Sequence, residues 1–217
     1  MKYFKQDIVC VLLAGGHARR MGGGDKCLKI LGKKTLLAHV IERIDSQVDK
    51  MVINANGDPE RFYEFNLEVI SDIVPGHLGP LAGIFSALEW TVSNLPEVKW
   101  VLSVPTDAPF LPVDLVEKLF ASIYADKFQE NSFVSENILE DIVVCAKSGG
   151  RNHPVVALWP VSCRLKLQNA LVNDGIRKID EFTSSLTLGT ANYHNKPIDP
   201  FMNINTLEDL RVANKLL

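Results

Sequence analysis

The stretch Asp7–Lys26, with the sequence DIVCVLLAGGHARRMGGGDK, carries the main prediction of fold for this chain. Its first part, Asp7–Leu13, is almost continuously aliphatic or β-branched, which is typical of a strand buried on both faces. Five glycines follow within ten residues, so the backbone can turn tightly there and bring several N–H groups together. Arg19, Arg20 and Lys26 add positive charge. A basic, glycine-rich loop directly after a buried strand favours phosphate binding over a solvated surface loop.

The common phosphate-binding motifs are absent from this loop and the residues after it. A Walker A loop requires a Gly-Lys pair followed by Ser or Thr, four residues beyond another glycine. Here Gly32-Lys33 is followed by Lys34, and Cys27 occupies the upstream glycine position. The dinucleotide fingerprint G-x-G-x-x-G is missing as well. The sequence therefore predicts a different kind of phosphate loop.

Outward from this loop, short apolar runs alternate with segments of helical period. This alternation predicts an α/β fold: a single three-layer Rossmann-like domain over residues 1–217, with a mostly parallel sheet flanked by helices. A polar, weakly patterned stretch, Gln129–Glu140, is expected to be a flexible excursion. Further strands are predicted at Lys50–Asn54, Val69-Ile70, Trp100–Val104, Ile142–Ala146 and Pro154–Trp159. Helices are predicted at Thr35–Ile44, Pro80–Thr91, Pro112–Tyr124, Val161–Val172 and Thr206–Leu217, with a short one from Pro59.

Composition excludes several other classes of protein. With 47% apolar and 23% charged residues, the chain is neither disordered nor collagen-like. Its net charge of −3 argues against a duplex-binding protein, so no nucleic-acid partner is expected. The four cysteines have neither zinc nor redox spacing and suit a reducing, cytoplasmic compartment. The first apolar run is short for a signal peptide, and no run approaches the roughly 18 residues of a membrane span.

Polar residues stand where the predicted strands end. Asn54 closes the second strand, Asp72 follows the third, and Asp107 follows the strand at Trp100–Val104. Ligands of open parallel sheets bind beyond the carboxyl ends of the strands, so these side chains are the candidates for chemistry. Each also has a plainer interpretation: Asp107 as a helix cap, and Asp72 and Asn54 as turn residues.

The segment Leu13–Lys26 resembles the signature loop of the molybdenum cofactor guanylyltransferase family, because it reads Leu-Ala-Gly-Gly-x-Ala-Arg-Arg-Met-Gly-Gly-x-Asp-Lys. Related enzymes that act on sugars or isoprenoid precursors usually carry Ser or Thr at the position of Ala18. Two departures are Cys27, where a small residue such as glycine is expected, and the unmatched stretch Gln129–Asp141. Further similar segments are Asn54-Ala55-Asn56, Gly79–Gly83, Pro105–Phe110, Arg151–Pro154, Gly175–Arg177 and Phe201–Thr206.

The resemblance implies an enzyme that transfers GMP from GTP to the terminal phosphate of molybdenum-molybdopterin and releases pyrophosphate. A phosphate monoester with a second pKa of about 6 is largely dianionic near neutral pH, so no general base is needed. Positioning and neutralisation of two anions become the main tasks. The implied cofactor is Mg²⁺, and the implied partners are GTP and molybdenum-molybdopterin, with transient contact to the molybdenum-inserting enzyme and to molybdoenzyme chaperones.

The resemblance also assigns roles to residues. Asp107 would hold the metal, and Lys26 with Arg19 and Arg20 would contact the triphosphate and the leaving pyrophosphate. The N-terminal half would bind nucleotide and the C-terminal half pterin, although Asn205 alone can also be explained as a cap of the last helix. The expected nucleotide-binding residues are Leu13, Ala14, Gly15, Lys26, Asn54, Asp72 and Asp107, and the expected pterin-binding residues are Arg177, Asn203 and Asn205.

Two other functions remain open from the sequence. One is a related transferase that uses CTP or a sugar phosphate. The other is a non-catalytic nucleotide-binding adaptor. Asp107 argues against the adaptor, because mere binding does not require a metal ligand near the α-phosphate.

Overall fold

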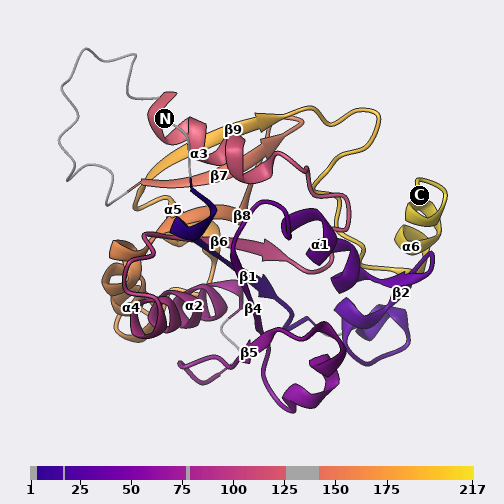
Figure 1. Cartoon of the computed structure of the whole chain (residues 1–217), viewed down its shortest axis with the longest axis horizontal. Coiled ribbons are helices and arrows are strands. Elements are labelled where there is room, and N and C mark those ends of the chain that lie inside the picture. The colour runs from indigo at the N-terminus through magenta and orange to yellow at the C-terminus, as the bar shows by residue number, and fades with distance from the viewer. Residues whose placement is uncertain (1–3, 17, 77–78, 126–141) are drawn as a thin grey trace.

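The continuous aliphatic runs form the central strands of one seven-stranded sheet (Figure 1). A computed structural model describes residues 4–16, 18–76, 79–125 and 142–217. The strand order is β5-β4-β1-β6-β8-β7-β9. The strands are β1 (Ile8–Leu13), β4 (Lys50–Asn54), β5 (Glu68–Ile70), β6 (Trp100–Pro105), β7 (Ile142–Ser148), β8 (Arg151–Pro160) and β9 (Thr187–Tyr193), and a separate small hairpin joins β2 (Ile30–Leu31) to β3 (Lys34–Thr35).

The direction of the strands divides the sheet into two parts. β5, β4, β1 and β6 run parallel, so their carboxyl ends meet at one edge. β8 runs antiparallel to both β6 and β7, whereas β9 pairs parallel with β7. The predicted α/β domain with a mostly parallel sheet is therefore confirmed.

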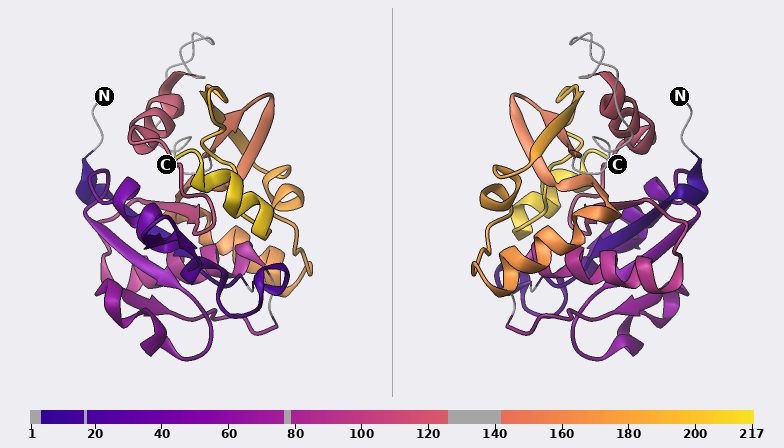
Figure 2. Two further views of the ribbon diagram at one scale, coloured as in Figure 1. Left: turned by 90° about the vertical axis from the view of Figure 1, so that its right-hand side faces the viewer. Right: turned by 90° about the vertical axis from the view of Figure 1, so that its left-hand side faces the viewer.

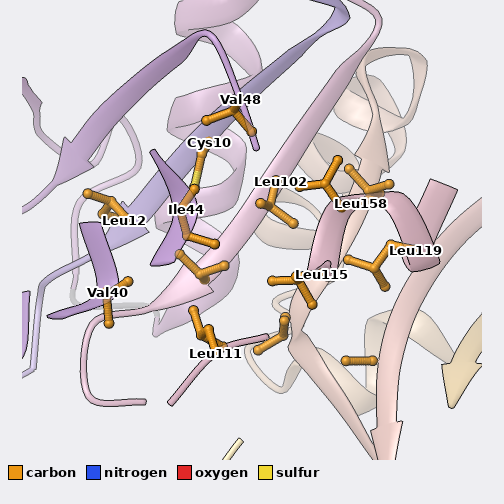
Figure 3. Close-up of a cluster of buried hydrophobic side chains, with 14 of the residues drawn as sticks. Cys10, Leu12, Val40, Ile44, Val48, Leu102, Leu111, Leu115, Leu119 and Leu158 are labelled. Carbon is orange, nitrogen blue, oxygen red and sulfur yellow. The ribbon is translucent and has the colours of Figure 1, made fainter. Parts of the chain in front are cut away.

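Helices cover both faces of the sheet and produce three layers (Figure 2). Alternate side chains of β1 enter opposite cores: Cys10 packs with α1 and α3 residues, and Val11 packs with α2 residues. Figure 3 shows the first of these cores, in which Ile44 and Leu115 approach the central strands from α1 and α3. The helices are α1 (Leu36–Ile44), α2 (Pro80–Asn94), α3 (Leu115–Ala125), α4 (Arg164–Val172), α5 (Ile179–Thr183) and α6 (Leu207–Asn214).

Several predicted boundaries differ from the structure. α3 begins at Leu115 rather than at Pro112, and α4 begins at Arg164 after a short 3₁₀ turn. The segment from Pro59 forms a 3₁₀ helix that extends to Phe65. β9, α5 and the β2–β3 hairpin were not predicted, because they are short and their apolar patterns are weak. The stretch 129–140, predicted to be a flexible excursion, lies outside the described residues.

A capping box fixes the start of the last helix. The Thr206 hydroxyl accepts from the backbone N–H of Asp209, and the Asp209 carboxylate accepts from the backbone N–H of Thr206. α6 lies beside β2 (Figure 1), where Ala213 packs against Leu31 and Met21 of the glycine-rich loop. The C-terminal segment is thereby held against the loop that follows β1.

All four cysteines are buried thiols outside any disulfide. Burial raises the pKa of the Cys27 thiol to about 12 and that of Cys145 to about 11. Cys27, which departs from the expected small residue, therefore serves as a small apolar side chain. Among the described helices, none is long and apolar enough to cross a membrane.

Candidate active site

A cavity of about 690 Å³ opens at the carboxyl ends of the parallel strands. This is the position at which open α/β sheets bind ligands. Its walls come from the ends of β1, β4 and β6, from the start of β8, and from the segment before α6. Among the predicted site residues, those that line it are Leu13, Gly15, Lys26, Asn54, Asp72, Asp107 and Asn203.

Lys26 and Asp107 form the charged centre of the cavity. The Lys26 ammonium donates a short hydrogen bond to Asp107 Oδ2, and the two side chains are only 12% and 18% exposed. The backbone N–H of Lys26 donates to Gly16 O at 3.1 Å, which brings the lysine back across the loop. At this depth a charge pair interacts more strongly than on the surface, because less water screens it.

The strand pairing explains why these two residues meet. β1 and β6 are adjacent, with Leu13 opposite Pro105, so the loop after each strand leaves the sheet at the same place. The Thr106 hydroxyl donates to Leu13 O at 3.0 Å and joins the two loops directly. Asp107 is not the cap of α3, since that helix begins only at Leu115.

Asp107 also fits a divalent metal. Its Oδ1 is buried and has no hydrogen-bond partner among the described residues, whereas Oδ2 is paired with Lys26. A buried carboxylate oxygen without a partner is costly unless a cation or donor binds it. In the described part of the chain, no three His, Cys, Asp or Glu side chains gather as a metal site. Mg²⁺ commonly takes one or two carboxylates together with waters and phosphate oxygens.

Asn54, Asn56 and Asp72 form a second cluster at the ends of β4 and β5. Asn54 Nδ2 donates to Asp72 Oδ1 at 3.0 Å, and Asn56 Nδ2 donates to Oδ2 at 2.8 Å. The Asp72 backbone N–H returns a bond to Asn56 Oδ1 at 2.9 Å. Each carboxylate oxygen keeps a further lone pair, so the oriented Asp72 can still accept from a ligand.

Gly83 in α2 permits this cluster to form. A Cβ at Gly83 would stand 2.2 Å from Asn54 Oδ1 and 2.7 Å from Leu13 Cδ2. Only a residue without a side chain lets the first turns of α2 approach the ends of β1 and β4 so closely. The glycine therefore determines the position of Asn54.

Asn205 contacts Lys26 rather than capping α6, and its expected role in pterin binding stays a prediction. Lys26 donates a short hydrogen bond to Asn205 Oδ1, although Asn205 itself is not a lining residue. The Asn205 backbone N–H donates to the Asp209 carboxylate at 2.9 Å, and this bond lowers the pKa of Asp209. The capping box thus anchors Asn205 beside Lys26, and Asn203 lines the cavity from the same segment.

Ala14, Arg20 and Arg177 do not line the cavity. Ala14 is buried and its N–H donates to Asn54 O at 2.9 Å, whereas Gly15 has open space where a side chain would stand. Arg177 is exposed, and its guanidinium donates to the carbonyl oxygens of Leu171 and Ile176. Arg20 is exposed and is not a lining residue, and the side chain of Arg19 lies outside the described part of the structure.

Sequence reasoning gave no role to several residues of the cavity. Asn56 could have been found, because it stands two positions after Asn54 in the same short polar run. Gly83 and Thr106 lie in segments that resemble the family, but the role of each depends on a contact that only the packed sheet creates. His153 lines the cavity and bonds to a buried serine. Its segment, Arg151–Pro154, resembles the family, although a histidine before a proline gives no functional signal by itself.

This sheet, with a basic glycine-rich loop and a carboxylate at adjoining strand ends, defines the class of α/β nucleotidyltransferases. Residues 10–187 match the family of the MobA-like NTP transferase domain. The fold agrees with that of molybdopterin-guanine dinucleotide biosynthesis protein A from Archaeoglobus fulgidus, at a TM-score of 0.67 and 24% identity over 96% of this chain and 97% of that one.

Curated relatives specify the family more closely. The molybdenum cofactor guanylyltransferase of Nitrobacter hamburgensis is 48% identical over 95% of this chain and 92% of its own length. The enzyme of the same name from Mesorhizobium japonicum is 40% identical over 98% of this chain and 97% of its own length. The chain therefore belongs to the molybdenum cofactor guanylyltransferase family and is a nucleotidyltransferase.

Proposed function

We propose that the chain transfers GMP from GTP to the terminal phosphate of molybdenum-molybdopterin. The observation that carries this proposal is the pairing of Lys26 with Asp107 at the cavity, with Asp107 Oδ1 buried and lacking a partner among the described residues. Relatives that cover nearly the whole chain bear the name of that activity. A lysine beside a metal-competent carboxylate is what a polyphosphate substrate requires.

In this reaction the bond between the α-phosphorus and its bridging oxygen breaks, and a new bond forms from the acceptor phosphate oxygen to the same phosphorus. Pyrophosphate leaves with the electron pair of the broken bond. The attacking phosphate is largely a dianion near neutral pH, so no proton has to be removed by the enzyme. The chain therefore has to hold two anions in line and reduce their repulsion.

Lys26 is the residue that reduces the repulsion between the two anions. Its ammonium contacts triphosphate oxygens, either in place of Asp107 or while still bonded to it, and the bond to Asn205 keeps the ammonium directed into the cavity. Asp107 would hold Mg²⁺ through Oδ1, the oxygen without a partner, and a metal bound there supplies further neutralisation of the triphosphate. Arg19 and Arg20 remain proposed contacts of the departing pyrophosphate.

Asp72 is the proposed reader of the base. Guanine presents an N1–H and a 2-amino group on one edge, and a carboxylate offers only acceptors to such an edge. Asn54 and Asn56 hold the carboxylate in a fixed orientation, which favours a defined partner over a freely rotating group. Cytosine lacks this pair of adjacent donors, so the proposal favours GTP over CTP.

The second half of the chain supplies the proposed pterin side. Asn203 lines the cavity, whereas Arg177 is bonded to carbonyl oxygens of its own region and, like Asn205, remains a proposed pterin contact. We further propose that the domain occupies residues 1–217, that the enzyme works in the cytoplasm, and that it exchanges its labile pterin through transient contacts with the molybdenum-inserting enzyme and molybdoenzyme chaperones.

The test is incubation of the purified protein with Mg²⁺, molybdenum-loaded pterin and each of the four NTPs in turn. Mass spectrometry would detect the pterin–nucleotide adduct and pyrophosphate. We expect an adduct with GTP alone. An adduct with CTP instead would retain the metal site and overturn the role of Asp72. No adduct with any nucleotide, with intact pterin, would overturn the proposed function.

A further inference from the structure

A buried hydrogen-bond network stands behind the cavity wall formed by β8. Ser148, at the end of β7, is 3% exposed, and its hydroxyl oxygen lies 2.8 Å from His153 Nε2. The same hydroxyl donates to Asp199 Oδ1 at 2.9 Å. Asp199 Oδ1 also accepts from the backbone N–H of Phe201 at 3.0 Å. His153 is the member of this network that lines the cavity together with Phe201.

The network determines which ring nitrogen of His153 carries hydrogen. A serine hydroxyl has one hydrogen, and here that hydrogen is donated to Asp199, whose carboxylate offers acceptors. Ser148 Oγ can then only accept from the imidazole, so Nε2 must carry the hydrogen. In the neutral ring the other nitrogen, Nδ1, is then a bare acceptor. Nδ1 has no hydrogen-bond partner in the described part of the chain.

The surroundings keep the ring neutral and fixed. Burial lowers the pKa of His153 below its usual value of 6.5, and Arg151 acts in the same direction, whereas Asp199 raises it. The Phe201 ring packs on the imidazole at a centroid distance of 4.8 Å. Tyr193 in turn holds Phe201 edge-on at 5.1 Å. Ser148 and Phe201 together fix the orientation of the imidazole.

We infer that His153 is a specificity-determining residue for the acceptor substrate, presenting Nδ1 as a fixed hydrogen-bond acceptor to an N–H donor of a pterin-type heterocycle. This inference rests on the proposed function, because it concerns the second substrate of the same cavity. A pterin carries ring N–H and amino donors that an uncharged acceptor can recognise. The strand ends that hold Lys26 and Asp107 form a different wall of the cavity, so His153 has no proposed contact with GTP.

Two substitutions separate the acceptor at Nδ1 from the anchor at Nε2. His153→Gln keeps an amide N–H within reach of Ser148 but places no acceptor at the position of Nδ1. His153→Asn places an amide oxygen near Nδ1 and gives up the anchor. We expect His153→Gln to raise the KM for molybdenum-loaded pterin about tenfold, the value of one lost hydrogen bond, with the KM for GTP unchanged. His153→Asn should recover part of the loss.

The matched control is His39→Gln. His39 Nε2 also has a hydrogen bond, to Leu31 O at 2.8 Å, but His39 does not line the cavity. This variant should keep both KM values. Equal KM values for pterin in the wild type and His153→Gln, with adduct still formed, would overturn the inference and leave the proposed function intact. Absence of adduct in the wild type would instead overturn the proposed function.

The tautomer itself is measurable without turnover. Nitrogen NMR of ¹⁵N-histidine-labelled protein distinguishes a protonated from a bare ring nitrogen, and His153→Gln identifies the signal that belongs to this residue. We expect Nε2 protonated and Nδ1 bare in the free enzyme, with the Nδ1 signal shifting when pterin is added. A signal from protonated Nδ1 would overturn the inference, whatever the kinetic result.

Discussion

The two walls of the cavity are built by different means. On the wall formed by β1, β4 and β6, parallel strands end together, and polar residues stand at or soon after the ends of β4 and β6, whereas the loop after β1 returns Lys26 to the same place. On the wall formed by β7 and β8, the strands are antiparallel with a bulge after Cys145, and the polar groups form a buried network that reaches Asp199. The residues of the first wall can be predicted from the sequence, because ligands bind beyond the carboxyl ends of parallel strands. Those of the second wall are brought together only by packing.

The comparison separates two kinds of specificity. Charged groups dominate the first wall, as polyphosphate binding requires, because strong and poorly screened interactions offset the repulsion of anions. At His153 the inferred contact is one hydrogen bond from an uncharged heterocycle to the neutral ring, and the buried network behind the ring ends at the Asp199 carboxylate. Substitutions on the two walls should therefore differ both in magnitude and in the substrate that they affect.

The largest effect is expected at Asp107. Asp107→Asn removes the negative charge that would hold the metal, and kcat should fall about a thousandfold, because metal stabilisation of transition-state charge is worth several kcal/mol. Steady-state kinetics across a Mg²⁺ titration would measure this. Asp45→Asn, at an exposed position at the end of α1, is the control and should keep full activity. An Asp107→Asn enzyme with full activity at low Mg²⁺ would contradict the mechanism.

Gly83→Ala sets packing against helix propensity. Propensity alone predicts a gain of about 1 kcal/mol in a helix interior. The added Cβ would lie 2.2 Å from Asn54 Oδ1, so we expect a net loss of about 2 kcal/mol in the free energy of unfolding, as in other overpacked cores. Denaturant unfolding measures the sign directly. The KM for GTP should rise as well, since Asn54 must move. A variant more stable than the wild type would contradict the close contact between α2 and Asn54.

Asn56→Ala tests whether the orientation of Asp72 matters for the base. The substitution removes both bonds between the Asn56 amide and Asp72 but leaves the bond from Asn54. We expect the KM for GTP to rise about tenfold, in line with the loss of a charge-assisted hydrogen bond. The preference for GTP over ITP, which lacks the 2-amino group, should shrink. If the ratio of kcat/KM for GTP to kcat/KM for ITP is unchanged, Asp72 does not contact the base.

The smallest effect is expected in the pH dependence of the second wall. Protonation of His153 converts Nδ1 from an acceptor to a donor, so the KM for pterin should rise as the pH falls through the pKa of His153, which lies below 6.5. Burial and Arg151 lower that pKa, and Asp199 opposes them. His153→Gln should lack this rise. The substrate phosphate itself titrates near pH 6, and this titration affects both enzymes equally. Dividing the KM of the wild type by that of His153→Gln at each pH therefore leaves only the effect of His153.

The correct predictions came from local patterns. The buried strand β1 and the helix that begins after Thr206 follow from patterns in neighbouring residues, and both are found as predicted. Helix starts were less accurate: α3 begins three residues late, because Pro112 and Asp114 form a turn before it. β9 was not predicted, since four of its seven residues are not buried and its apolar pattern is weak.

The sequence by itself determined that a buried strand, a basic phosphate loop and three strand-end polar residues belong to one α/β sheet, because periodicity and glycine spacing are local properties of the chain. Only the tertiary structure decided which of these groups touch. Asn205 reaches Lys26 across 179 positions, and Asp199 acts on His153 through Ser148, from which it is 51 positions away. Such contacts depend on strand order and on close packing, which no single segment encodes.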